Sequence, residues 1–297
     1  MAEAGAGAVR PGPGASPLGV RSRLRGALGG SGAAWLLVLP LGFLVLLLAV
    51  PLSFLVVEAL SEGGFSAAID DNVFRESALR TVIMATVVAA LTLILGTAYA
   101  LALAVSPRWV AVLLLISLFT LFWTSLLVRT YGWMLLVLPQ GPIYSVLHGL
   151  GLREEPLDIF QTTFAAYPAM VHVMLPYVVL PVYAAIRQLD PTHLRAARVL
   201  GARPLLTLRK VVLPQLKSGI MAGAILVWIL SLGFYVTPQL LGSPTAPTIA
   251  GMIGATFIAP DQTSQGAAMS LLLLGVVIVI YIAADRAFKV SEQWGRG

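Results

Sequence analysis

Five of the twenty residues from 195 to 214, RAARVLGARPLLTLRKVVLP, are basic, and none is acidic. So dense a positive charge suits two tasks, which are to hold a segment against anionic lipid or to bind a partner. One glycine, Gly201, and two prolines, Pro204 and Pro214, divide the stretch. A loop that only fixes topology and touches lipid needs charge alone, so the glycine and prolines favour a shape built to dock into a groove of a soluble partner.

The predicted shape is a helix, a glycine turn and a second helix. Asp190 is placed to cap the first helix, with Pro191 at the first helical position, where its missing N–H has no cost. Gly201 is placed to take the left-handed conformation that ends many helices. Pro204 can start the second helix, and Pro214 marks a bend after it. The second helix would present one apolar face, made of Leu205, Leu208 and Val212.

No catalytic or metal-binding pattern stands elsewhere in the sequence. The only Lys-Ser pair, Lys217-Ser218, lacks the glycine of a phosphate-binding loop, and there is no cysteine. Three histidines, His148, His172 and His193, are far apart. His172 falls inside an apolar stretch, where an ionisable group is a functional candidate. The alternative is a neutral imidazole bonded to a neighbouring helix.

The elements that position these residues are apolar helices long enough to cross a bilayer. Hydrophobic residues make up 58% of the 297 residues and charged residues only 11%, against about 45–50% and 25% in soluble domains. A spanning helix needs about 20 apolar residues. Six stretches meet that length: 35–57, 80–105, 109–128, 164–186, 219–241 and 267–284. The first is too long for a signal peptide, and we expect it to be retained.

The distribution of basic residues predicts the orientation of the six spans. The two termini, the 106–108 turn and the 187–218 loop carry 15 of the 19 basic residues. The opposite side has four: Arg75, Arg80, Arg129 and Arg153. Positive loops face the cytoplasm, so both termini are predicted to be cytoplasmic. The expected divisions are a disordered basic tail at 1–33, a six-helix membrane domain at 34–290 and a short tail at 291–297.

The basic loop resembles the EAA loop of binding-protein-dependent ABC importer permeases, which seats in a cleft of the ATPase subunit. Two alanines, a glycine after three residues and a closing Leu-Pro follow the family pattern. Arg195 departs from it, because the family has Glu there, and the exchange calls for a compensating acid on the partner. The positions that the resemblance identifies as the ATPase-coupling loop are Arg195, Ala196, Ala197, Gly201, Val211, Leu213 and Pro214.

A wider resemblance covers residues from about 35 to 288. LFWTSLLVRTYGWMLLV (121–137) and LGFYVTPQLLGSP (232–244) are similar to segments of spermidine/putrescine-type importer permeases, closest to their B-type subunit. This resemblance implies an all-α, six-helix, type I importer architecture in the bacterial cytoplasmic membrane. The implied partners are a second permease, related or identical, two cytoplasmic ATPases and an extracytoplasmic solute-binding protein, with no nucleic acid. ATP and Mg²⁺ would be used by the ATPases, while this chain would bind no cofactor or metal and catalyse nothing.

The solute is expected to be spermidine, putrescine or a related polyamine. Aromatic faces can stabilise a desolvated ammonium group. The candidates for the solute pathway are Trp123, Trp228, Phe234 and Tyr235, with plain helix packing as the alternative for Trp228. Three alternatives for the whole chain stay open: a permease of the same subfamily with another solute, a secondary transporter working alone, and a membrane scaffold.

Overall fold

The computed structural model describes residues 31–259 and 261–288, and every regular element in these residues is a helix. The chain divides into two units, one up to Leu55 and one from Val56 onward. The first unit consists of most of α2 (Ser31–Leu60), an apolar helix that contains Pro40 and Pro51. The predicted tail 1–33 lies outside the described residues except for its last three, with which α2 begins. The predicted tail 291–297 also lies outside them.

Four of the predicted spans are single long helices. Besides α2, these are α4 (Asn72–Val105), α8 (Thr163–Arg187) and α15 (Thr263–Phe288), all long and apolar enough to cross a membrane. Counting each bent helix pair as one span raises the number in the described residues to six at most. The all-helical membrane fold is therefore confirmed, with four unbroken spans.

The predicted span 109–128 is wrong as a single helix. It is divided into α5 (Arg108–Trp123) and α6 (Leu126–Val137), and the axis turns by 106° between Arg108–Trp123 and Leu126–Gly149. At the break, Thr124 takes an extended backbone conformation, and the hydroxyl groups of Thr120 and Thr124 donate to the carbonyl oxygens of the residues four positions earlier, over 2.8 Å each. Bonds of this kind often bend helices, and a hydropathy scale does not report them.

The predicted span 219–241 is also divided. α12 (Lys217–Leu232) ends at Gly233, and a short helix, α13 (Val236–Leu241), follows. Glycine is a poor helix former. Pro238 lacks the N–H that a helix running on from α12 would use, so a new helix starts just before it. The last third of the predicted span thus forms a separate element.

The core of the second unit is the contact of α4, α8 and α12. Gly96 on α4 and Gly223 on α12 both lie against Val178 on α8. A Cβ atom added to them would come within 2.7 Å and 3.1 Å of Val178, respectively. Small residues let helices approach this closely in a membrane, where no hydrophobic effect drives them together. The three helices therefore form the close-packed frame for the rest of the unit.

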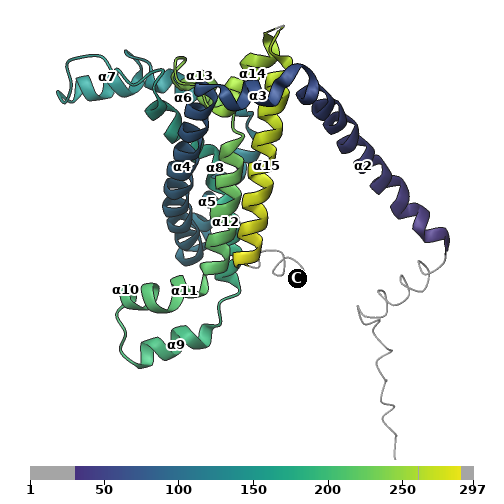
Figure 1. The fold of residues 1–297 in the computed structure, drawn as a ribbon. Helices are drawn as coiled ribbons and strands as arrows, with labels where there is room; N and C mark the ends of the chain where they lie inside the picture. The colour runs from purple at the N-terminus through teal and green to yellow at the C-terminus, as the bar shows by residue number, and fades with distance from the viewer. Residues whose placement is uncertain (1–30, 260, 289–297) are drawn as a thin grey trace, which may run out of the picture. The chain divides into compact units, whose positions relative to one another are not determined.

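Short helices gather at the two ends of this frame (Figure 1). At one end lie α9 (Pro191–Val199), α10 (Pro204–Thr207), the π-helix η2 (Leu208–Val212) and α11 (Leu213–Gln215), near the last turns of α15. At the other end lie α3 (Gly64–Asp70), which follows η1 (Ser61–Gly63), α7 (Pro142–Gly149), α13 and α14 (Ile249–Ile258). The prediction of six spans did not include α14.

Candidate functional site

The first helix of the basic loop begins as the sequence predicts. The carboxylate of Asp190 accepts a hydrogen bond from the backbone N–H of Thr192 over 2.8 Å, and Pro191 is the first helical residue. Hydrogen bonds from the backbone and side chain of Thr192 hold the pKa of Asp190 below its usual range. The cap fixes the direction in which α9 leaves the membrane helix α8.

Gly201 ends the loop's first helix in the left-handed conformation, with φ of 69°. Its N–H donates to the carbonyl of Arg198, and the N–H of Ala202 donates to the carbonyl of Ala197, both over 3.0 Å. A side chain at Gly201 would meet nothing within 4 Å. The requirement for glycine therefore comes from the backbone angle alone, as predicted.

The second helix differs from the prediction of one regular helix over 204–212. α10 spans only Pro204–Thr207, and a π-helical turn follows at Leu208–Val212, where the N–H of Leu213 bonds to the carbonyl of Leu208. The predicted apolar face is incomplete, because Leu205 is exposed while Val212 packs against the core. The bend expected at Pro214 is present, and the axis turns by 66° between Pro204–Gln215 and Lys217–Leu232.

The positions of the EAA-like pattern differ in exposure. Ala197 is buried in the loop, whereas Ala196 and Arg195 are exposed. Val211 and Leu213 are half-buried beside the membrane frame, and Pro214 is exposed. The loop therefore presents Arg195 and Ala196 outward while Ala197 helps to hold its two halves together.

Two apolar side chains beside the glycine turn were not singled out from the sequence. Val199 and Leu200 are 87% and 84% exposed at the end of α9. Exposed neighbours of this kind mark a contact surface when they sit on a defined turn. The sequence gives only a weak signal for this surface, because a Val-Leu pair is common in a chain with 58% hydrophobic residues.

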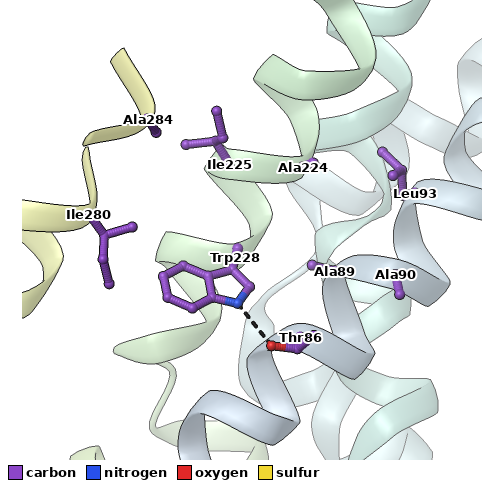
Figure 2. A pocket seen from close by; sticks show the side chains of 9 residues that line it. All are labelled: Thr86, Ala89, Ala90, Leu93, Ala224, Ile225, Trp228, Ile280 and Ala284. Carbon is purple, nitrogen blue, oxygen red and sulfur yellow. Dashed lines mark hydrogen bonds between the residues drawn. The ribbon is translucent and has the colours of Figure 1, made fainter. Parts of the chain in front are cut away.

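Trp228, one of the pathway candidates, lies in an open apolar groove of about 410 Å³ between α4, α12 and α15. Figure 2 shows its indole ring across the groove, with Thr86 on one side and Ile280 on the other. The indole Nε1 donates to the hydroxyl oxygen of Thr86 over 3.1 Å. The groove holds no charged side chain, so it offers a solute only the ring face and a hydroxyl group.

The other three pathway candidates lie on different elements. Trp123 ends α5 at the break before α6 and is 88% exposed. Phe234 packs against the core, and the ring of Tyr235 lies against Gly254 on α14. Within the described ranges none of the four aromatic rings contacts another. The structure thus brings no aromatic cage together from this chain alone.

His172 lies on α8 and bonds to a neighbouring helix, as the alternative interpretation predicted. Its Nδ1 accepts a hydrogen bond from Nε1 of Trp133 on α6 over 3.2 Å. Arg129 lies one turn before Trp133 on α6, in register with the part of α8 that follows His172. The orientation count placed Arg129 on the outer side of the membrane, but this side chain lies inside the bundle, half-buried. Apolar runs on both sides of it, LLV and WMLLV, are the signal that could have shown this.

Comparison with protein families gives one match that covers most of the chain. Residues 63–296 match the family described as binding-protein-dependent transport system inner membrane component. The spermidine/putrescine transport system permease protein PotB of Escherichia coli (strain K12) is 32% identical over 226 residues, 75% of this chain and 82% of PotB. The inner membrane ABC transporter permease protein YdcU of the same organism is 36% identical over 177 residues, 54% of each chain.

Solved structures show the same fold. A chain of a bacterial ABC transporter involved in the import of the acidic polysaccharide alginate superposes with a TM-score of 0.68. The match covers 90% of this chain and 98% of that chain, at 17% sequence identity. At this identity the likeness is one of fold, and it agrees with the close-packed frame of α4, α8 and α12.

Proposed function

The chain belongs to the binding-protein-dependent transport system inner membrane component family, and from this premise we propose that it is a permease subunit of an ATP-driven importer of polyamines. In this proposal six spans, two of them broken, cross the inner membrane with both termini in the cytoplasm. The chain forms part of the pathway, and a second permease, related or identical, forms the rest. The relatives it matches are themselves transport permease subunits, and none belongs to an enzyme family.

The observation that carries the coupling part of the proposal is the turn at Gly201. The loop at one end of the frame is rich in basic residues and contains a capped helix, a left-handed glycine and an exposed apolar pair, Val199 and Leu200. Such a projection fits a groove on a soluble partner. We propose that this partner is a cytoplasmic ATPase, present in two copies, which uses ATP and Mg²⁺ while this chain binds no cofactor.

Movement of the ATPases would then reach the membrane through the loop. α9 follows α8 directly, and α11 leads into α12, two of the three helices of the frame. A shift of the loop therefore displaces α8 and α12 as near-rigid bodies, and the wall of the pathway moves with them. A solute-binding protein would deliver the solute at the opposite end, where α3, α7, α13 and α14 lie.

The polyamine assignment draws support from the 32% identity with PotB. The test is uptake of radiolabelled putrescine by the assembled importer in a strain that lacks other polyamine importers. We expect unlabelled putrescine and spermidine to compete efficiently. Competition by an anionic or neutral solute, with none by either polyamine, would remove the polyamine assignment and leave the importer in place.

A further inference from the structure

Arg129 on α6 is a charged side chain that the bundle partly encloses. Its Nε is shielded from solvent and makes no hydrogen bond within residues 31–259 and 261–288. No carboxylate in that part of the chain forms an ion pair with it. A guanidinium group left this way inside a membrane protein is costly unless an anion reaches it.

The register of α6 on α8 places Arg129 well inside the bundle. Val137, the last residue of α6, packs against alanines in the first turns of α8. Trp133 bonds to His172 further along α8, so Arg129, one turn earlier on α6, is in register with the stretch of α8 near Tyr177, at the middle of that helix. α6 therefore runs antiparallel to the first half of α8, and Arg129 lies toward the end of α6 that is nearest the middle of α8.

The polar groups around Arg129 are hydrogen-bond donors. His172 accepts the Trp133 indole at Nδ1, so its ring proton sits on Nε2, and the imidazole is neutral. The phenol of Tyr177 has no hydrogen-bond acceptor in the described residues and is free to donate. A guanidinium, an imidazole N–H and a phenol O–H together favour an oxyanion, and the planar guanidinium suits a carboxylate.

This chain has no carboxylate to offer at that depth. No Asp or Glu occurs between Glu76 and Glu154, or between Asp158 and Asp190. The next one beyond Asp190 is Asp261, after α14. Beyond it, only Asp285, in the last turn of α15, stands in a described helix.

We propose that Arg129, with His172 and Tyr177, receives the carboxylate of an Asp or Glu in a span of the second permease subunit. This inference rests on the proposed function, which supplies that subunit. A resident carboxylate neutralises Arg129 in every state of the transport cycle, whereas a polyamine is a cation and cannot.

The test uses the whole importer, expressed with its own second permease and ATPases and purified through a tag on this chain. Arg129→Gln is expected to lower the second permease retained after washing by about tenfold, because the partner's carboxylate loses its counter-charge. Arg129→Lys keeps the charge and is expected to lose less. Arg108→Gln is the matched control: Arg108 is exposed at the start of α5, and retention should equal wild type.

A cross-link identifies the acid directly. The sequence has no cysteine, so Arg129→Cys gives a single reactive site. Paired with cysteines at each Asp and Glu in the spans of the second permease, it is expected to form one disulfide under mild oxidation. This measurement still decides the matter if Arg129→Gln fails to accumulate in membranes.

Three results have distinct meanings. Wild-type retention in Arg129→Gln, or no cross-link at any acid, overturns the inference and leaves the proposed function standing. If Arg129→Gln retains the second permease as wild type does but needs a higher solute concentration for half-maximal uptake, then the solute supplies the oxyanion. This result also overturns the inference. If the wild-type chain retains no second permease, the proposed function itself fails.

Discussion

Trp133 on α6 donates a hydrogen bond from its indole Nε1 to Nδ1 of His172 on α8 over 3.2 Å, and the two rings meet edge to face. This contact connects α6, the second part of a broken helix pair, to the unbroken helix α8. α5 and α6 are separated by a sharp turn, so α5 cannot hold α6 in place by continuity. Together with the packing of Val137 against α8, the bond holds α6, and with it Arg129, in place.

Replacing Trp133 by Phe removes the donor but keeps an aromatic ring. The acceptor on His172 is then left without its partner inside the bundle, and we expect a loss of stability of about 1–3 kcal/mol. Thermal unfolding of the purified chain in detergent measures this, with Tyr131→Phe on the exposed face of α6 as the control. Equal melting temperatures for Trp133→Phe and wild type would show that the bond does not hold α6.

Gly201→Val strains the turn of the basic loop without any clash, since a Cβ there meets nothing within 4 Å. The left-handed angle costs a β-branched residue about 1–2 kcal/mol. Transport should fall while membrane insertion stays normal, and Gly201→Asn should retain more activity because Asn tolerates this conformation. Gly275→Val, at an open position in α15, is the control. Wild-type uptake by Gly201→Val would contradict the coupling role.

The cap at Asp190 makes the start of α9 sensitive to acid. Hydrogen bonds to the carboxylate depress its pKa in the folded loop, so its contribution is complete above the ordinary value near 3.8. The contribution is lost as the pH falls through the lower, folded-state pKa. The protection of the Thr192 and His193 amides against hydrogen exchange, expressed relative to the intrinsic rate at each pH, should therefore fall at low pH and in Asp190→Ala. Asp190→Asn keeps the cap and should remove the pH dependence; a dependence that persists in this variant would refute the explanation.

The basic loop was predicted from sequence because its conformation is set locally. A cap, a proline and a glycine within a dozen residues determine α9 and its end, and each acts on its own backbone. The π-turn at Leu208–Val212 escaped prediction because no local pattern specifies it. It lies where the loop meets the membrane frame, and Val212 packs against the core there.

The broken spans escaped prediction for a different reason. Hydropathy reports only that a segment is apolar, and the stretch of α5 and α6 is largely apolar, so it gives no sign of the extended backbone at Thr124. The same limitation applies to Arg129, because the charge count assigned it to the outer side and gave no sign that its side chain is half-buried on α6. Its neighbours on α8 are more than 40 residues away in sequence, so only the folded register brings them together.

The proposed orientation has a direct test, since the chain has no native cysteine to interfere. Single cysteines at Glu154 and Gln262 should react with a membrane-impermeant maleimide in intact cells. Cysteines at Arg198 and Arg21 should react only after the membrane is opened, because the positive segments face the cytoplasm. Labelling of Arg198→Cys in sealed cells would overturn both the orientation and the coupling proposal.

The most direct test of the account is retention of an ATPase subunit by this chain. The tagged chain is purified from membranes of its own host in mild detergent, and ATPase is quantified by mass spectrometry and by ATP hydrolysis. We expect a stoichiometric ATPase subunit with the wild-type chain. A double variant, Val199→Asp with Leu200→Asp, should lose most of it at equal membrane abundance, because these side chains form the exposed apolar tip of the loop. A wild-type chain that retains no ATPase, or a double variant that retains all of it, would contradict the proposal that this loop couples the permease to ATP hydrolysis.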